Sequence, residues 1–142
     1  SATFSQCFGA PFLPLRPTRY AEMLRDKITE TGATVWLVNT GWVGGSVGVG
    51  SRIKLSYTRA MVNAILNGSA AKSTFTVEPV FGLSIPNTIE GVPADVLIPR
   101  NLWSDTAAYD QNAARLVGLF VDNFKKFTNV SADIIKGQPI SA

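Results

Sequence analysis

Apolar residues recur at helical spacing in three stretches of the chain, and the first stretch begins at Pro17, since proline suits the first helical position. Its apolar side chains follow at Tyr20, Leu24 and Ile28, with charged residues on the other face. We expect this helix to end at Gly32, because glycine readily adopts the left-handed conformation of a C-terminal cap.

Two further helices are predicted, each with a serine as its N-cap. Ser56 is expected to cap a helix over residues 57–67, and Gly68 to stop it. Ser104 is expected to cap the longest helix, which runs to about Phe127. The apolar stripe of the longest helix consists of Tyr109, Ala113, Leu116, Phe120, Phe124 and Phe127.

Three stretches have the pattern of strands. Residues 34–38 form a continuous apolar run rich in β-branched residues, which predicts a buried central strand. Residues 52–55 are a candidate short strand, and residues 74–85 alternate in the manner of a strand. Residues 86–103 hold three prolines and are expected to form an ordered loop over a surface.

The order of these elements is helix, strand, glycine-rich loop, helix, strand, loop and helix, which predicts an α/β or α+β fold. The length of 142 residues suits one domain over residues 1–142, with residues 128–142 as a tail. A hydrophobic content of 46% excludes general disorder. The phenylalanine-rich opening and the loop over residues 86–103 have no evident partner among these elements, so we expect both to pack against protein outside this chain.

The types of residue present exclude several classes of site. With one cysteine, Cys7, the chain can form neither an internal disulfide nor a cysteine-cluster metal site. With no histidine, it can build neither a Ser-His-Asp triad nor a Cys-His dyad. The sequence therefore predicts no catalytic residue and no metal-binding residue within these 142 residues.

Basic charge is concentrated in a stretch that has no acidic residue, between Thr31 and Val77. Its cations are Arg52, Lys54, Arg59 and Lys72. Such a stretch either attracts an anion or is simply a solvated basic face. Four charges are too sparse for a surface that follows a nucleic-acid backbone, so we expect no nucleic-acid partner.

The chain opens without the pattern of a signal peptide, and no apolar run approaches the roughly 20 residues of a membrane span. We therefore expect no membrane partner and a cytoplasmic location. The first residue is not methionine, which is consistent with a fragment or a processed product.

Residues 41–50 contain five glycines and invite comparison with a phosphate-binding loop. That motif would place a lysine, and then a serine or threonine, at the positions of Ser51 and Arg52. Without the lysine no group reaches the terminal phosphates, and an arginine cannot bind magnesium. The stretch is therefore a flexible ligand loop or a plain surface loop.

Arg52 and Thr58 flank the predicted start of the second helix, where free N–H groups favour anions and polar ligand atoms. Arg52 can lay its planar guanidinium on an aromatic base, and Thr58 can hydrogen-bond a ring nitrogen or an amine. The alternative is that Thr58 serves the first turn of its own helix and that Arg52 is solvated.

Six short segments match a known family in the family's own order. They are TFSQCFGAPF (residues 3–12), PTRYAE (17–22), LVNTGW (37–42), TRA with AILNG (58–60 and 64–68), PRN (99–101) and FVDNF (120–124). Together they resemble the C-terminal part of ATP-dependent phosphoenolpyruvate carboxykinase, over nearly all of the chain. The resemblance implies an α/β (α+β) fold that is part of the family's C-terminal nucleotide-binding lobe, not a complete enzyme.

The same resemblance implies a fragment of a lyase of gluconeogenesis, which interconverts oxaloacetate and ATP with phosphoenolpyruvate, ADP and CO₂. The implied ligands are ATP and ADP, with Mg²⁺ and Mn²⁺ bound by residues outside this chain. The implied protein partner is the upstream part of the same enzyme, which holds the phosphate loop and the metal ligands. The fragment alone is therefore expected to be inactive.

By resemblance, the family's adenosine-binding stretch corresponds to Arg52, Ile53, Thr58 and Arg59, of which the first three are the expected nucleotide-binding residues. Arg52 would pack on or beside the adenine, Ile53 would contribute a backbone contact, and Thr58 would hydrogen-bond the nucleotide. Asn39 is a weaker candidate for the same pocket. Two alternatives stay open: a stand-alone purine-nucleotide-binding module without catalysis, and a basic interaction domain with no small ligand.

Overall fold

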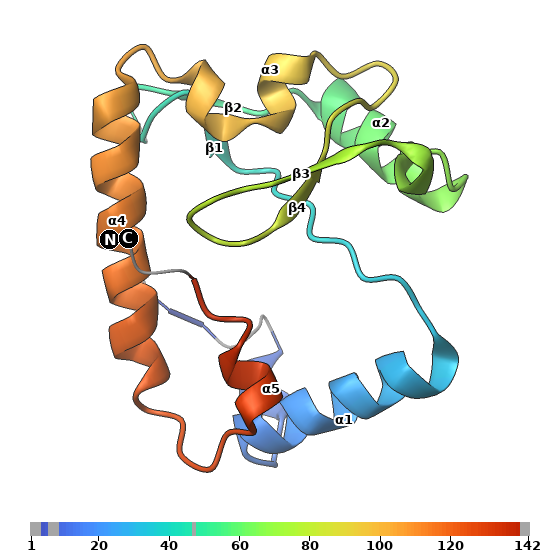
Figure 1. Ribbon diagram of the computed structural model, residues 1–142, viewed down its shortest axis with the longest axis vertical. Coiled ribbons are helices and arrows are strands. Elements are labelled where there is room, and N and C mark those ends of the chain that lie inside the picture. The colour runs from blue at the N-terminus through green and yellow to red at the C-terminus, as the bar shows by residue number, and fades with distance from the viewer. Residues whose placement is uncertain (1–3, 6–8, 47, 140–142) are drawn as a thin grey trace. The chain divides into compact units, whose positions relative to one another are not determined.

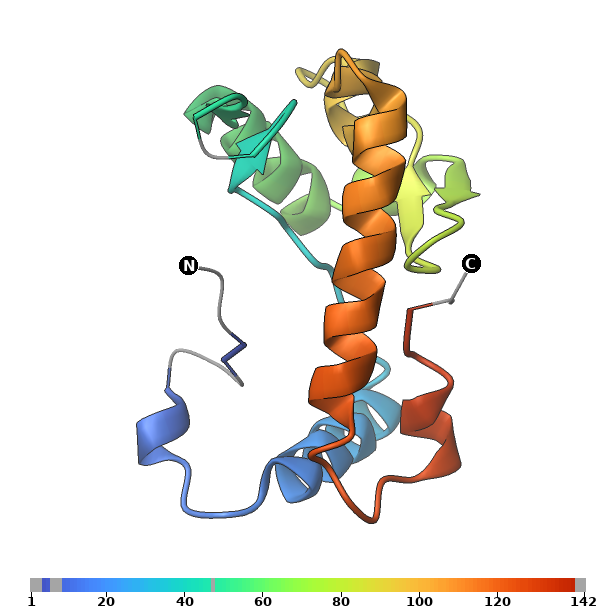
Figure 2. The ribbon, with the colours of Figure 1, turned by 90° about the vertical axis from the view of Figure 1, so that its left-hand side faces the viewer.

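The computed structural model describes residues 4–5, 9–46 and 48–139 (Figure 1). These residues divide into two compact units. Unit 1 combines the described residues up to Val35 with Leu119–Gln138, and unit 2 comprises Trp36–Gly118 and Pro139. The boundary at Gly118 falls inside α4 (Thr106–Phe124), which is one continuous helix (Figure 2).

Unit 1 is built from helices. Its elements are η1 (Ala10–Phe12), α1 (Pro17–Thr31), the end of α4 and α5 (Ala132–Ile135). The prediction for α1 is confirmed: it begins at Pro17, and Gly32 ends it with φ 64° while donating its N–H to the carbonyl of Ile28 at 2.9 Å. The predicted tail, residues 128–142, contains α5.

Unit 2 combines helices with two small antiparallel sheets. Its elements are β1 (Trp42–Val43), β2 (Ser51–Arg52), α2 (Leu55–Leu66), η2 (Ala70–Lys72), β3 (Phe75–Val77), β4 (Ser84–Pro86), α3 (Ala94–Leu97), η3 (Pro99–Leu102) and the start of α4. β1 pairs with β2, and β3 pairs with β4. This mixture of helices and small sheets is compatible with the predicted α/β class.

The core of unit 2 is a cluster of five buried apolar residues: Ala64, Ala70, Ile89, Val92 and Leu97. The first two are alanines of α2 and η2, and their small side chains let other segments approach closely. The other three belong to residues 86–103, which were expected to lie over a surface and to need protein outside the chain. That expectation is wrong for these three residues, because this segment forms α3 and η3 and completes the core of its own unit.

The predicted central strand over residues 34–38 does not form. Val35 is 60% exposed and Leu37 is 78% exposed. A strand needs a neighbouring strand to take up its backbone hydrogen bonds, and none pairs with this segment in the described part of the chain. Only Trp36 of this run is half-buried, with its ring 6.2 Å from that of Phe75.

The other strand predictions are confirmed only in part. Residues 74–85 form two short strands instead of one, because a turn at Glu78 reverses the chain between them. The carboxylate of Glu78 accepts hydrogen bonds from the N–H groups of Val80 and Phe81. Within the stretch predicted as a strand at residues 52–55, only Arg52 is in a strand, and α2 begins at the last of these residues.

Both predicted serine N-caps are wrong, although α2 and α4 themselves are confirmed. The N-cap of α2 is Lys54, so Ser56 lies inside the first turn. At the start of α4 the cap is Asp105, whose Oδ1 accepts a hydrogen bond from the N–H of Ala108 at 3.0 Å. A carboxylate at a helix start also interacts favourably with the helix dipole, which favours Asp105 over Ser104.

The predicted apolar stripe of α4 is only partly buried. Ala113 is buried as expected, but Val117, which was not assigned to the stripe, is equally buried. Leu116 and Phe120 are exposed. The helix ends at Phe124, three residues earlier than predicted.

Candidate functional site

The glycine-rich stretch is the loop of the β1–β2 hairpin. Trp42 lies opposite Arg52 in this hairpin. At the other end of the loop, the N–H of Gly50 donates to the carbonyl of Ser46 at 2.9 Å. Gly45 is buried with φ 155°, and a Cβ there would lie 2.9 Å from the amide nitrogen of Gly50. The loop is therefore a tight turn that requires glycine at position 45. Position 47 of the loop lies outside the described residues.

The predicted site residues lie along the short connection that leads from the end of the hairpin into α2. The N–H of Ile53, a half-buried residue, donates to the carbonyl of Gly41 at 3.0 Å, which ties the connection to the hairpin. Two residues later α2 begins, and the N–H of Thr58 donates to the carbonyl of Lys54 at 3.2 Å in its first turn. Arg52 and Thr58 thus stand at the two ends of one short, hydrogen-bonded connection.

Arg52 and Thr58 differ in exposure, but the polar group of neither side chain has a partner in the described part of the chain. Arg52 is exposed, and its guanidinium makes no hydrogen bond, ion pair or ring contact with other described residues. Thr58 is half-buried, and its hydroxyl makes no hydrogen bond within the same part of the chain. Both groups can therefore bind a ligand without first giving up a partner in the described chain.

The positive charge predicted around this connection is not neutralised by nearby acids. None of the four cations of the acid-free stretch forms an ion pair with a described residue. The ammonium of Lys54 lies 5.5 Å from the centre of the Tyr57 ring, a cation–π contact that leaves its charge in place. The first turn of α2 contains no acidic residue. The start of α2 therefore favours an anionic or electron-rich ligand.

Asn39, the weaker candidate, is already engaged by its own backbone. Its Oδ1 accepts a hydrogen bond from the N–H of Gly41 at 2.9 Å, which closes a local turn before β1. The structure thus gives Asn39 a role in shaping the hairpin entrance, and it leaves the amide nitrogen of its side chain as the group that can meet a ligand.

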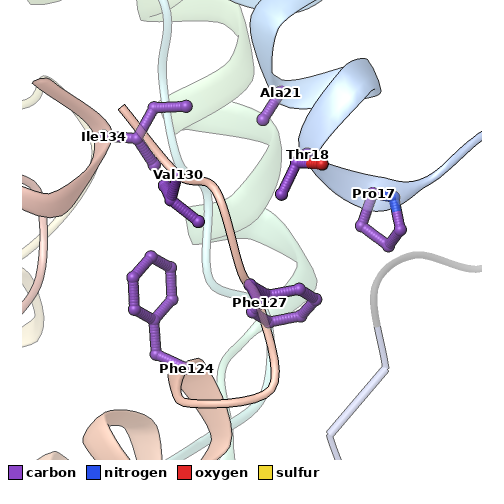
Figure 3. Close-up of a pocket in the computed structure, with 7 residues that line it drawn as sticks. All are labelled: Pro17, Thr18, Ala21, Phe124, Phe127, Val130 and Ile134. Atoms are coloured by element: carbon purple, nitrogen blue, oxygen red, sulfur yellow. The ribbon is translucent and has the colours of Figure 1, made fainter. Parts of the chain in front are cut away.

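Two apolar cavities lie in unit 1, and none of the predicted nucleotide-binding residues lines either of them. The first, of about 130 Å³, is lined by Pro17, Thr18, Ala21, Phe124, Phe127, Val130 and Ile134 (Figure 3). The second, of about 380 Å³, is lined by Leu13, Leu15, Pro17, Tyr20, Ala21, Leu24 and Phe127. Sequence reasoning missed both. The signal that was available is the apolar spacing Pro17, Ala21 and Leu24 on one face of α1.

An ion pair in unit 2 links η3 to α4. Arg100 donates from Nε and from Nη2 to the two carboxylate oxygens of Asp110, both at 2.8 Å. These hydrogen bonds lower the pKa of Asp110 and raise the pKa of Arg100. Beside the pair, burial raises the pKa of Tyr109, whose ring meets that of Trp103 edge-on at 5.6 Å. The charged groups of this cluster are engaged with each other, and the pair links η3 to α4 within unit 2.

No group of three or more His, Cys, Asp or Glu residues in the described part of the chain could hold a metal ion. No helix in the described part is both long enough and apolar enough to cross a membrane.

A family model described as phosphoenolpyruvate carboxykinase matches residues 1–95, which include the hairpin and all of α2. The chain belongs to this family. Among curated relatives, the chain is 61% identical to a protein of Lysinibacillus sphaericus over 92% of its length and 53% identical to one of Pelobacter propionicus over 94%. It is 55% identical to a protein of Bacillus cereus over 99%. All three relatives are named phosphoenolpyruvate carboxykinase (ATP).

Membership of the carboxykinase family confirms the resemblance read from the six segments. The chain spans only about a quarter of the length of these relatives: 25%, 26% and 27% respectively. The relatives align with almost the whole chain, so both units belong to the matched region. The chain is thus a partial piece of a carboxykinase sequence.

Proposed function

We propose that the chain is the C-terminal part of an ATP-dependent phosphoenolpyruvate carboxykinase and supplies part of the adenosine pocket of its nucleotide-binding lobe. The complete enzyme converts oxaloacetate and ATP to phosphoenolpyruvate, ADP and CO₂ in gluconeogenesis, in the cytoplasm. The observation that carries this proposal is the 61% identity to a relative named for that ATP-dependent enzyme, over a quarter of its length.

The pocket residues of the proposal are Arg52, Ile53 and Thr58. Support for them comes from the unengaged guanidinium and hydroxyl at the ends of one short connection. In this proposal Arg52 lies against the adenine ring, a contact worth about 0.5–2 kcal/mol. Thr58 donates or accepts one hydrogen bond, worth roughly 0.5–1.5 kcal/mol net, and the backbone at Ile53 borders the base.

Phosphoryl transfer is assigned to the rest of the enzyme. The family's Mg²⁺ and Mn²⁺ need clusters of carboxylate or imidazole ligands, and the described residues form none. The proposal therefore places the metal ions and the phosphate-binding groups on the part of the enzyme outside these 142 residues. The role left to this chain is to bind and orient the nucleoside end of ATP.

Kinetics of the complete enzyme test the pocket. Arg52→Ala is expected to raise the KM for ATP by about 2- to 30-fold, and Thr58→Ala by about 2- to 13-fold, with smaller losses in turnover. Arg52→Lys keeps the charge but loses the plane, so it should resemble Arg52→Ala. Lys72→Ala, a cation of the same acid-free stretch, is the matched control and should leave the KM unchanged. Unchanged KM values in both Arg52→Ala and Thr58→Ala would refute the assignment.

A stand-alone purine-nucleotide module is the second candidate function, favoured by the unpaired cations near the start of α2. Addition of the missing part of the enzyme separates the two. We expect the 142-residue chain to form no phosphoenolpyruvate by itself, and the complete chain to form it from oxaloacetate and ATP. A complete chain that binds ATP but makes no phosphoenolpyruvate would favour the module.

A further inference from the structure

The turn at the end of α2 contains the dipeptide Asn67-Gly68, which the proposed nucleotide site does not use. Asn67 is the C-cap of α2, and among the asparagines of the chain it alone is followed by glycine. Asn67 is exposed, and Gly68 has a φ of 78° with no atom beyond its chain neighbours within 4 Å of where a Cβ would lie. The backbone nitrogen of Gly68 is therefore accessible to the side chain of Asn67, because glycine has no side chain to block it.

The side-chain carbonyl of Asn67 is polarised by the turn that it closes. Its Oδ1 accepts a hydrogen bond from the N–H of Ser69 at 2.9 Å. When a nucleophile adds to Cγ, negative charge develops on this same oxygen, so a donor at Oδ1 favours the addition. No acidic residue lies between Thr31 and Val77, so no carboxylate of that stretch opposes the developing charge.

The nucleophile available to this carbonyl is the backbone nitrogen of Gly68. Its N–H donates to the carbonyl of Ile65 at 3.2 Å, whereas the N–H of Asn67 donates to that of Asn63 at 2.9 Å. Closing a ring between the Gly68 nitrogen and Cγ of Asn67 requires rotation away from the helical backbone, in which ψ of Asn67 is −1°. This rotation breaks the longer of the two hydrogen bonds, in the last turn, where helices fray.

We propose that Asn67 is a self-modifying site, at which the chain converts this asparagine to aspartate and isoaspartate with water as the co-reactant. The nitrogen of Gly68 loses its proton to solvent and bonds to Cγ of Asn67, and the side-chain amide takes up a proton and leaves as ammonia. The succinimide ring that forms then adds a water molecule at either of its carbonyls. Opening at one carbonyl leaves aspartate, and opening at the other leaves isoaspartate, whose backbone runs through the former side chain.

Both products change the junction between α2 and η2. Each places a carboxylate at the C-terminal end of α2, where the helix dipole disfavours negative charge. Isoaspartate also adds a carbon to the backbone between Ala64 and Ala70, which are 5% and 1% exposed in the core of unit 2. Because a close-packed core tolerates such displacements poorly, the modification is expected to loosen α2 and η2.

Peptide mass spectrometry of the complete enzyme, incubated without nucleotide at mildly alkaline pH, tests the proposal. Asn39 is an internal control: it is exposed, its Oδ1 accepts a hydrogen bond from the N–H of Gly41 at the same 2.9 Å, and Thr40 follows it. We expect Asn67 to be converted at least about 10-fold faster than Asn39, because the branched Cβ of Thr40 crowds its own backbone nitrogen. Electron-capture fragmentation distinguishes isoaspartate from aspartate in the product.

Asn67→Gln is the matched variant, because glutamine would have to close a larger ring that forms more slowly. The variant should keep its side-chain amide over the same incubation, and hydrogen exchange of α2 and η2 should accelerate only in the unsubstituted enzyme. Equal conversion at Asn67 and Asn39, or conversion to aspartate without isoaspartate, would overturn the proposal. Neither measurement uses ATP or carboxykinase activity, so a failure of the proposed function leaves the result interpretable.

Discussion

Unit 2 and unit 1 have similar helices but very different interiors. In unit 2, five apolar residues are buried in one cluster around α2. In unit 1, α1 is longer than α2, yet it has no buried residue at all. The difference teaches that a regular apolar pattern is enough to specify a helix, whereas a core requires segments from elsewhere in the chain.

The source of the core in unit 2 is an irregular segment. Residues 86–103 bring Ile89, Val92 and Leu97 against α2, and their backbone is held by local bonds such as that from the N–H of Val92 to the carbonyl of Ile89 at 3.1 Å. Unit 1 has no comparable segment among its described residues. The helices of unit 1 contact only one another among the described residues. The rings of Phe4 and Phe120 meet edge-on at 5.1 Å, but both side chains remain exposed to solvent.

Hydrogen exchange on the 142-residue chain should show the largest contrast between the units. Amides of α2 are expected to exchange at least several thousand-fold more slowly than those of α1, because opening α2 requires loss of the core at a cost of about 5 kcal/mol or more. Amides of α1 open without that cost. Peptide-resolved mass spectrometry measures both helices in one sample, and equal protection of α1 and α2 would contradict the comparison.

A matched pair of leucine substitutions sharpens the comparison. Leu97→Ala removes a core side chain of unit 2 that is 9% exposed and should cost about 2–5 kcal/mol. Leu24→Ala removes the same atoms from an exposed position of unit 1 and should change stability by about 0.5 kcal/mol or less. All three tryptophans belong to unit 2, so urea unfolding followed by tryptophan fluorescence reports on that unit.

Helical spectroscopy supplies the control for this pair. Circular dichroism at the helix wavelength should still register α1 in the Leu24→Ala variant to the same extent as in the unsubstituted chain. A loss of stability from Leu24→Ala as large as that from Leu97→Ala would show that α1 has a core partner after all.

These contrasts show which parts of the fold the sequence could predict. The helices were predictable because periodicity, Pro17 and Gly32 act locally, within a few residues. The strand over residues 34–38 was not, since a strand exists only when a second strand pairs with it. The burial of residues 86–103 was not predictable either, because an irregular segment carries no period that reveals which side chains face a core.

The candidate site, like the fold, could be predicted from the sequence only in part. The identities of Arg52, Ile53 and Thr58 came from resemblance to the family, and their assignment stays a prediction. The short connection between the hairpin and α2, and the absence of partners for the Arg52 guanidinium among described residues, depend on packing and needed the structure. The apolar cavities of unit 1 were missed because their walls come from segments about 100 residues apart along the chain, such as Ala21 and Phe127.

The N-cap of α4 offers a smaller test within unit 2. Asp105→Ala should destabilise the unit by about 0.5–2 kcal/mol, because the N–H of Ala108 loses its acceptor and the helix dipole loses a compensating charge. Ser104→Ala, one position earlier, is the matched control and should have almost no effect. Urea midpoints of the two variants decide the matter, and a larger effect at Ser104 would restore the cap predicted from the sequence.

The smallest effect is expected at the ion pair of Arg100 with Asp110, and its signature is a dependence on pH. The hydrogen bond from Arg100 lowers the pKa of Asp110, so the folded state binds this proton less readily than the unfolded state. The pair therefore stabilises unit 2 fully above the ordinary pKa of aspartate, near 4, and this stabilisation is lost as the pH falls through the lower folded value.

Asp110→Asn should lower the tryptophan-monitored unfolding midpoint at neutral pH, and the difference from the unsubstituted chain should vanish in acid. Asp122→Asn, which breaks an exposed pair with Lys125 in unit 1, should leave that midpoint unchanged at every pH. A difference at Asp110 that persists unaltered into acid would mean that the asparagine disturbs packing, and that the charge of the pair contributes nothing to the core-containing unit.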